Sequence, residues 1–360
     1  MKTILLNPGP VSLSEHVRDA LSRPDLCHRE EEFVSLQQGL REKLLRVYDL
    51  HTERWAAILL TGSGTAAIEA MVSSCIPRGG HLLSIENGVY GERMSKIART
   101  YGIETESLRA EWGSVIDLPA LERRLATDTI SHVTVVHHET TTGRLNELTE
   151  LLDICAATNV KVLLDGVSSF GAEAIDFSHP ALEACAATAN KCLHGVPGTS
   201  FVIAERETML SQSEQPRSVY LDLRAYFSQQ ETGGTPFTQS VQTFYALDAA
   251  LDEFFAAGGL PARHQLFSER MAAVRQTLAG LGIDGLLPAG DSSCVLNAFA
   301  LPANTSYQSL HDALKAEGFV IYAGQGKLAE TLFRISMMGE ITAADVKRLC
   351  ETLASVIGAP

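Results

Sequence analysis

The amino-acid sequence predicts an α/β fold, with a large domain built on a mainly parallel sheet covered by helices and a small C-terminal α+β domain. Three observations support this prediction. The chain has 360 residues, enough for about two domains of roughly 150 residues each. Short apolar runs alternate with amphipathic stretches between residues 56 and 205, as in a parallel sheet with helices on both faces. From residue 240 the pattern changes to long helices, followed by a mixture of strands and helices over residues 283–360.

Six short apolar runs are the candidate strands of the large domain, because most of them have the Val, Ile and Leu content of strands that are buried on both faces. They span residues 56–60, 81–85, 104–108, 133–137, 160–164 and 199–204. Four helices are expected between them, since apolar residues recur there at i, i+3 and i+4 spacing. They span residues 65–74, 92–101, 118–126 and 148–158, and Asp117 is a candidate N-cap for the third. These helical crossovers predict a parallel order of the strands.

Long helices over residues 241–257 and 261–281 mark the passage to a second domain, and Gly282 is placed to end the second helix. The remaining pattern predicts strand 294–300, helix 307–317, strands 320–322 and 332–336, and helix 342–357. We therefore expect an N-terminal arm over residues 1–20, a large domain over 21–260 and a small domain over 261–360 that includes a linking helix at 261–282. The first 30 residues are rich in Pro and Gly, so we expect them to cross a surface rather than to build a core.

The composition excludes several classes of protein. Apolar residues make up 45% and charged residues 20% of the chain, which is typical of a globular protein. The formal net charge of −14 repels phosphate backbones, so binding of nucleic acid is not expected. No run approaches 18 apolar residues, so no membrane span is expected. Seven cysteines, odd in number and without a Cys-x-x-Cys pair, predict reduced thiols and a cytoplasmic location.

A glycine-rich turn at residues 62–65, Gly-Ser-Gly-Thr, follows a predicted strand and opens a predicted helix. Small residues at a helix N-terminus let backbone N–H groups approach an anion, so a phosphate is one candidate ligand. The same turn with Ala67 also satisfies a dinucleotide fingerprint, and Glu86 ends the next strand at roughly the required distance. A turn that serves only the geometry of the strand-to-helix junction is the third interpretation.

Asp165 follows the predicted strand 160–164, at the edge of the sheet where open α/β folds bind ligands. A carboxylate there could pair with a ribose, with a metal, or with the protonated ring nitrogen of pyridoxal phosphate, which makes the ring an electron sink. The structural alternative is that Asp165 only caps the turn that follows it.

Lys191 stands between an alanine-rich run and a glycine-rich loop, in small and weakly polar surroundings. A lysine in such surroundings loses its proton more easily than a solvated one, as reaction with an aldehyde cofactor requires. The alternative is an ordinary surface lysine.

The run His137-His138-Glu139 also ends a strand and offers two imidazoles and a carboxylate. Neighbouring side chains on a strand point to opposite faces, so we do not expect a metal site there. The threonine hydroxyls at residues 140–142 are better suited to hydrogen-bond a ligand, or to stabilise a turn.

Together these residues resemble the fold-type I, class V pyridoxal-phosphate aminotransferases. The resemblance covers nearly the whole chain, and the combined motifs are far more specific than any one of them. The matching runs are residues 7–10, 62–65, 87–91, 139–143, 163–171, 189–192, 195–198, 220–223, 318–322 and 333–335. The resemblance implies a homodimeric enzyme with pyridoxal 5′-phosphate as its cofactor and with no metal site.

The resemblance also implies a role for each matched position. Lys191 would bind the cofactor covalently and move the proton during transamination, and Asp165 would hold the pyridinium nitrogen. The other expected cofactor-binding residues are Ser63, Gly64, Thr65, Tyr90, Thr140 and Thr238 of the partner subunit. Arg334 would bind the carboxylate or phosphonate of a substrate through its fixed fork of donors. The remaining expected substrate-binding residues are Pro8, Gly9 and Arg29.

More narrowly, the sequence resembles members that transfer an amino group between 2-aminoethylphosphonate and pyruvate, giving phosphonoacetaldehyde and L-alanine. The segment around Arg29 departs from a common pattern and leaves the side groups of the substrate open. Arg29 could add a cation for a hydroxylated or carboxylated phosphonate, or it could be neutralised by the three glutamates at residues 30–32.

Three other functions stay open on the sequence alone. An alanine:glyoxylate or serine:pyruvate aminotransferase would share the cofactor and most of the motifs. A nicotinamide-dependent oxidoreductase would use the glycine turn at residues 62–67, but it leaves Lys191 and Asp165 unexplained. A catalytically silent binding protein is the third, although Lys191, Asp165 and Arg334 are all present.

Overall fold

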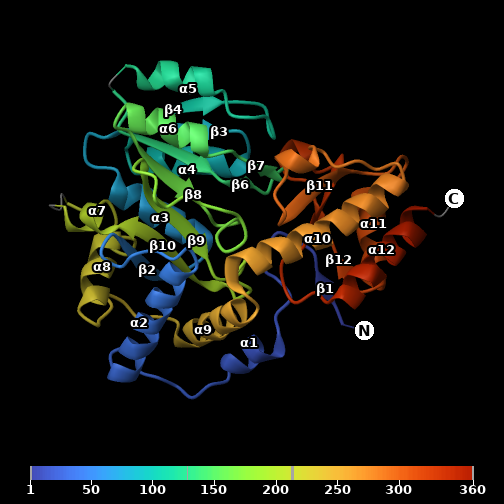
Figure 1. Ribbon diagram of the computed structural model, residues 1–360, viewed down its shortest axis with the longest axis horizontal. Coiled ribbons are helices and arrows are strands. Elements are labelled where there is room, and N and C mark those ends of the chain that lie inside the picture. Colours follow the sequence, from blue (N-terminus) through green and yellow to red (C-terminus); the bar gives the residue numbers. More distant parts are fainter. Residues whose placement is uncertain (1, 128, 212–214, 359–360) are drawn as a thin grey trace.

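The computed structural model describes residues 2–127, 129–211 and 215–358, and Figure 1 shows their arrangement. Residues 1 and 359–360, which belong to the predicted arm and small domain, lie outside the described residues. The large sheet has seven strands in the order β2-β10-β9-β8-β5-β3-β4. The strands are β2 (Trp55–Gly62), β3 (His81–Glu86), β4 (Glu104–Arg109), β5 (His132–Val136), β8 (Lys161–Asp165), β9 (Leu182–Thr188) and β10 (Gly198–Glu205). The fold class predicted from the sequence is confirmed.

All six predicted strands of the large sheet are present, but the sequence pattern did not reveal β9. That strand is fully buried and rich in Ala, and Thr188 is its only β-branched residue, so it lacks the pattern that marks its neighbours. It pairs in parallel with β8, whereas β10 runs antiparallel to both β9 and β2. The predicted parallel order therefore fails only for β10, and the sheet is mainly parallel, as expected. The connection from β9 to β10 contains no helix and returns the chain directly, which produces an antiparallel pair.

Helices cover both faces of the large sheet (Figure 1). One face packs against α2 (Glu31–Arg46), α5 (Leu118–Leu125), α6 (Thr149–Ala157) and α9 (Val241–Ala256). The other face packs against α3 (Gly64–Cys75), α4 (Val89–Thr100) and α8 (Leu223–Glu231). The predicted cap of α5 is confirmed, because the Asp117 carboxylate accepts a hydrogen bond of 2.9 Å from the backbone N–H of Ala120.

A second sheet, in the order β11-β14-β13, forms the core of the C-terminal part together with three helices. Its elements are β11 (Leu296–Ala300), α11 (Tyr307–Ala316), β12 (Phe319–Val320), β13 (Tyr322–Ala323), β14 (Leu332–Ser336) and α12 (Ala343–Ile357). The predicted strand 320–322 is divided, because β12 pairs with the N-terminal segment and β13 with β14. The long helix α10 (Gly259–Gly280) leads into this part and ends as predicted, with Gly282 in the left-handed region.

The N-terminal segment does not merely cross a surface, as the sequence suggested. Strand β1 (Ile4–Leu5) pairs in parallel with β12, and the side chains of Ile4 and Leu6 are fully buried in the C-terminal core. Helix α1 (Glu15–Ala20) follows and packs against α9. The short apolar run therefore completes a core that is built from residues near the other end of the chain, a contact that local sequence cannot reveal. Among the described residues, no helix combines the length and apolarity needed to cross a bilayer.

Three short elements complete the connections around the large sheet. Strands β6 (His138–Glu139) and β7 (Arg144–Leu145) form a small antiparallel hairpin after β5. Helix α7 (Arg206–Leu210) follows β10. The hairpin extends the chain beyond the carboxyl end of β5, next to the carboxyl end of β8. This edge of the sheet brings together most of the residues that the sequence singled out.

Candidate active site

Asp165 and Lys191 lie at the same edge of the large sheet. Asp165 is the last residue of β8 and stands in register with Ala186 of the neighbouring β9. Strand β9 ends two residues later, at Thr188, and the chain reaches Lys191 in the connecting loop. The charge of each side chain acts on the pKa of the other. Because β8 and β9 are parallel, the carboxylate and the amine meet where open α/β sheets bind ligands.

The Lys191 side chain is enclosed by the N-terminal segment. Its Nζ donates a hydrogen bond to the backbone carbonyl of Pro8. A Cβ on Gly9 would lie 3.1 Å from Cδ and Cε of Lys191, and the φ of Gly9 is +121°, so a side chain there is disfavoured on both counts. Burial lowers the pKa of Lys191 to about 8, although the charge of Asp165 opposes this shift. About one amine in ten is thus neutral at pH 7, far more than for a solvated lysine.

Asp165 is only 6% exposed. Burial raises the pKa of its carboxyl to about 6, against the stabilising backbone N–H of Val167 and the positive charges of Lys191 and Arg93. The Val167 N–H lies 2.9 Å from Oδ1. The group is therefore an anion at neutral pH, and it can hold a cationic ring nitrogen.

The turn at residues 62–65 joins β2 to α3 beside Asp165. Ser63 is the N-cap of α3, but its side chain makes no capping hydrogen bond, and the first turn of the helix contains no acidic residue. A Cβ on Gly64 would approach Val167 Cγ1 to 2.8 Å, so glycine allows the helix terminus to pack against the loop that follows Asp165. The free N–H groups and the dipole of α3 make this terminus an anion site.

Arg93 is a residue of this site that the sequence analysis missed. Its Nη1 lies 3.3 Å from the hydroxyl of Thr65, and its guanidinium carbon stands 4.6 Å from the centre of the Tyr90 ring. Among the described residues, no carboxylate forms an ion pair with Arg93. Tyr90 and Arg93 are three residues apart on the first turn of α4, so helical spacing predicts that they share a face.

Glu139 is also part of the site, although its sequence pattern indicated no role for this side chain. Its buried carboxylate accepts hydrogen bonds from the backbone N–H groups of Tyr90 and Gly91, at 3.2 and 3.4 Å. It therefore caps α4 from another segment, which explains why this helix begins three residues before the predicted start. A Cβ on Gly88 would lie 2.2 Å from Glu139, so glycine is required for this approach. Burial raises the pKa of Glu139 to about 7.

Arg334 connects the C-terminal part to this edge of the sheet. Its side chain on β14 is 2% exposed. Nε donates to the carbonyl of Ala323 and Nη1 donates to the carbonyl of Thr140, each at 2.8 Å. Arg334 has no carboxylate partner within the described ranges. The hydroxyl of Thr140 is itself buried and has no hydrogen-bond partner among the described residues, so an arginine fork and an unsatisfied hydroxyl are held together here.

Two predicted site residues are not brought to this group. Thr238 lies exposed in the loop before α9, and Arg29 lies exposed in the turn before α2. In the parts of the chain that the structure describes, no hydrogen bond or ion pair joins either side chain to Lys191 or Asp165. The loop that carries Thr238 is nevertheless anchored near the glycine turn, because the backbone N–H of Ser240 donates to the hydroxyl of Thr61 at 2.9 Å.

The two histidines before Glu139 bind the loop that follows Asp165. Nδ1 of His137 is 3.0 Å from the hydroxyl of Ser169, and Nδ1 of His138 is 3.0 Å from the carbonyl of Ser168. Burial lowers the pKa of both imidazoles to about 4, so they are neutral at physiological pH. Their observed contacts hold this loop in place.

The sheet order contradicts the dinucleotide interpretation. The glycine turn follows β2, which is the edge strand beside the antiparallel β10, whereas Glu86 ends β3 at the other end of the sheet. Glu86 is buried and bonded to the hydroxyls of Ser95 and Ser107 and, at 2.9 Å, to Nε of Arg109. It therefore cannot reach a ribose held at the glycine turn.

The observed residues fit pyridoxal phosphate. The helix terminus at Ser63 offers free N–H groups for a phosphate, and the Thr140 hydroxyl lacks a partner. Asp165 supplies an anion for the ring nitrogen, and Lys191 supplies a primary amine with a lowered pKa. This donor set matches each polar group of the cofactor.

Comparisons with known proteins agree with this arrangement. The sequence model of the family Aminotransferase class-V matches residues 14–349. The chain is 33% identical over 355 residues to a 2-aminoethylphosphonate–pyruvate transaminase of Bacteroides fragilis, covering 97% of this chain and 98% of the relative. It is 36% identical over 352 residues to the enzyme of the same name from Vibrio vulnificus, covering 96% and 95%.

Solved structures resemble the whole fold. A subgroup IV aspartate aminotransferase from Thermus thermophilus superposes with a TM-score of 0.89 at 28% identity and 99% coverage of both chains. An alanine–glyoxylate aminotransferase from Nostoc sp. superposes with a TM-score of 0.91 at 23% identity, over 99% of this chain and 96% of that one, which shows the shared fold. The chain therefore belongs to the class-V aminotransferase family, and its cofactor is pyridoxal phosphate.

Proposed function

We propose that this enzyme transfers an amino group between 2-aminoethylphosphonate and pyruvate, giving phosphonoacetaldehyde and L-alanine. The relatives from Bacteroides fragilis and Vibrio vulnificus, which match over nearly the full chain, carry the name of this activity. The observation that carries the proposal is the pairing of a low-pKa lysine and a buried aspartate with two arginines that lack carboxylate partners among the described residues. Such a site can hold a dianionic cofactor and an anionic substrate together.

Pyridoxal phosphate, when bound, withdraws electrons from the amino-bearing carbon of the substrate. Lys191 would hold the cofactor covalently and then, as a neutral amine, would take the proton from that carbon and pass it to the cofactor. Asp165 would remain ionised beside the ring nitrogen. Ser63, Gly64 and Thr65 would hold the phosphate. Tyr90 would lie against the cofactor ring, and Thr140 would hydrogen-bond it.

Arg93 and Arg334 are available to bind the anionic groups of the cofactor and the substrate, and their surroundings suggest different roles. Arg93 contacts Thr65 at the helix terminus, so we assign it to the phosphate side of the site. Arg334 is fixed by the carbonyls of Ala323 and Thr140, so its remaining donors would bind the carboxylate of pyruvate or the phosphonate of the amino donor. Pro8 and Gly9, which cover Lys191, would border the same space. Arg29 would join it only if its exposed turn moved over the site.

We further propose that the enzyme is a homodimer in the cytoplasm. The cytoplasmic location is supported by the seven cysteines, all of which are free. The dimer is supported by Thr238, which matches a phosphate ligand of the family yet is exposed in the single chain. Two large apolar side chains near it are also exposed, Val219 by 80% and Tyr220 by 43%.

The dimer can be tested together with the role of Thr238. We expect sedimentation velocity to show a dimer. We expect Thr238→Val to weaken binding of pyridoxal phosphate by roughly tenfold or more, because a hydrogen bond to a charged group contributes about 1.5–3 kcal/mol. Thr232→Val, at the exposed end of α8, is the matched control and should leave cofactor affinity unchanged. A monomer with full cofactor affinity would contradict the proposal.

The lowered pKa of Lys191 predicts how cofactor attachment depends on pH. With a pKa of about 8, roughly one amine in ten is neutral at pH 7 and most are neutral above pH 9. We therefore expect the rate of covalent attachment of pyridoxal phosphate to the apoprotein to reach half its maximum near pH 8 and to level off above about pH 9. Stopped-flow absorbance over a pH series measures this rate.

The control for this experiment is Lys161→Ala, since Lys161 lies at the opposite end of β8 and pairs with Glu205 at the surface. This variant should show the same pH profile. Lys191→Ala should show no covalent attachment and should lose at least about 10²–10⁴-fold in turnover. A rate that keeps rising toward pH 10, as an ordinary lysine would give, argues against a buried reactive amine.

The substrate assignment predicts the outcome of a donor and acceptor panel. With pyruvate as acceptor, we expect alanine to form fastest from 2-aminoethylphosphonate, compared with serine, other amino acids and hydroxylated or carboxylated amino phosphonates. We expect Arg334→Lys to raise the KM for pyruvate by roughly tenfold or more, because a lysine cannot replace the fixed fork.

Arg275→Lys is the matched control, because Arg275 lies on α10 and binds Asn297 and the carbonyl of Leu287, outside the site. It should leave the KM for pyruvate unchanged. A clear preference for glyoxylate as acceptor, or for serine as donor, would replace the proposed reaction by that of a different aminotransferase.

A further inference from the structure

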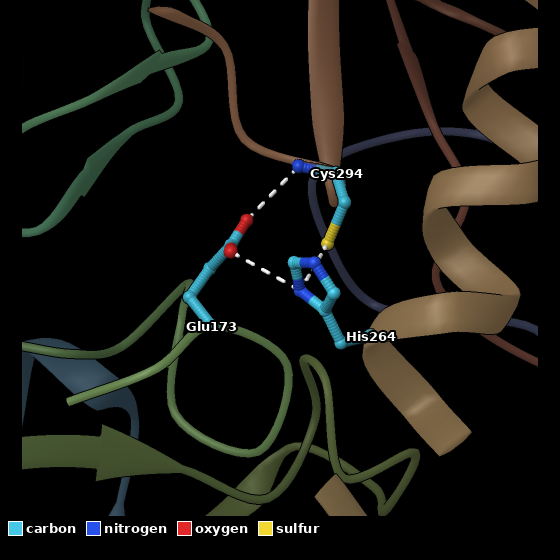
Figure 2. Close-up of side chains that lie close together, drawn as sticks. All are labelled: Glu173, His264 and Cys294. Carbon is cyan, nitrogen blue, oxygen red and sulfur yellow. Dashed lines mark hydrogen bonds and ion pairs between the residues drawn. The ribbon is translucent and has the colours of Figure 1, made fainter. Parts of the chain in front are cut away.

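Three side chains with metal-binding atoms meet at a place that the proposed reaction does not use. Figure 2 shows Glu173, His264 and Cys294 pointing toward one another from three different segments. Glu173 lies in the loop after β8, His264 lies on α10, and Cys294 lies just before β11. The three residues are 30 to 121 positions apart in the sequence, so the fold itself creates the cluster.

The distances match those around one small cation. Nδ1 of His264 lies 3.4 Å from Oε2 of Glu173 and 3.6 Å from Sγ of Cys294. The three ligand atoms all lie within 4.8 Å of one another. In a tetrahedral zinc site with bonds of about 2.0–2.3 Å, ligand atoms are separated by about 3.3–3.8 Å. The two distances from Nδ1 of His264 therefore already lie in the range expected between the ligands of a tetrahedral zinc ion.

The Glu173 carboxylate is buried, at 3% exposed, and its two oxygens have different partners. Oε1 accepts hydrogen bonds from the Ser293 hydroxyl at 2.5 Å and from the Cys294 N–H at 2.9 Å. Oε2 faces the imidazole of His264. No lysine or arginine forms an ion pair with Glu173 within the described ranges. The Glu173 carboxylate is therefore a negative group whose orientation is fixed by hydrogen bonds, as is typical of a metal ligand.

The negative charge of Glu173 affects the pKa of two nearby thiols, those of Cys294 and Cys192. Burial raises the pKa of the Cys294 and Cys192 thiols, and the charge of Glu173 raises both further. Without a cation, Cys294 is therefore a protonated and unreactive thiol, which argues against a role as a nucleophile or as a redox sensor. A divalent cation would reverse this effect, because it stabilises the thiolate directly.

The imidazole has a second hydrogen-bond partner that a cation must displace. Nδ1 of His264 lies 2.9 Å from the carbonyl of Ala172. In the absence of a cation, the Nδ1–H group satisfies this carbonyl and the carboxylate together. The side chain of His264 is 50% exposed, so the ring has room to turn and to exchange this proton through solvent for one on Nε2, which leaves a neutral imidazole with Nδ1 free to bind the ion. His264 and Glu173 also line a cavity of about 970 Å³, through which water and an ion can enter.

We propose that Glu173, His264 and Cys294 bind one Zn²⁺ ion, with the fourth position open to water from the adjacent cavity. A sulfur, a nitrogen and an oxygen donor together favour zinc over magnesium or calcium. Binding forms the Zn–S bond as the Cys294 thiol releases its proton to solvent, and no electron transfer is involved. One carboxylate, one thiolate and a neutral imidazole balance the charge of Zn²⁺, so the occupied site has no net charge. The ion would join the loop after β8, α10 and the start of β11.

The test measures zinc bound to the holoenzyme after dialysis against a buffer with a fixed concentration of free Zn²⁺. We expect one zinc per chain, measured by elemental mass spectrometry, and a higher unfolding temperature than for the metal-free holoenzyme. Cys294→Ser, His264→Ala and Glu173→Gln should each weaken zinc binding by about tenfold or more. Cys350→Ser and His311→Ala are matched controls on α12 and α11 and should retain the ion.

A second measurement does not depend on the folding of any variant. Co²⁺ added to the wild-type holoenzyme should give the visible absorption bands of a tetrahedral site with a sulfur ligand, and Zn²⁺ should abolish them. The proposal is contradicted if the wild-type enzyme retains no stoichiometric zinc and shows no tetrahedral cobalt spectrum. It is also contradicted if folded Cys294→Ser and His264→Ala bind zinc as tightly as the wild type.

Discussion

The structure depends on two opposite charges enclosed at one edge of the large sheet. Asp165 ends β8, and Lys191 follows the parallel neighbour β9, so the pairing of two strands brings the groups together. Burial is unfavourable for both charged forms, and it moves the two pKa values toward neutrality from opposite sides, to about 6 and about 8. The carboxylate therefore stays charged at pH 7, while a useful fraction of the amine is neutral.

The elements around Asp165 and Lys191 enclose the two side chains and supply groups that bind anions. The N-terminal segment covers Lys191 through Pro8, and it can do so because its apolar residues are anchored in the C-terminal core. Helix α3 presents its N-terminus because Gly64 packs against the loop after Asp165. Glu139 fixes the start of α4, which places Arg93 beside Thr65. The site thus combines contributions from both ends of the chain.

The sequence predicted the parts of this arrangement whose chemistry is local. Asp165, Lys191 and the glycine turn lie in short runs whose neighbours indicate strand ends and helix starts. Strand β9 escaped prediction because alanine and cysteine carry little strand signal, and the capping role of Glu139 escaped because its helix lies about 50 residues earlier in the chain. The roles of Thr238 and Arg29 stay predictions, since both are exposed here and depend on a partner or on a moving loop.

The most direct test of the account is the effect of Asp165→Asn on the titration of Lys191. The negative charge of Asp165 stabilises the protonated amine, so its removal should lower the pKa of Lys191. The pH at which cofactor attachment to the apoprotein reaches half its maximal rate should therefore fall below about 8 in this variant, while Asp176→Asn, at a surface turn, leaves it in place. An unchanged or higher midpoint in Asp165→Asn would mean that the two groups do not share one site.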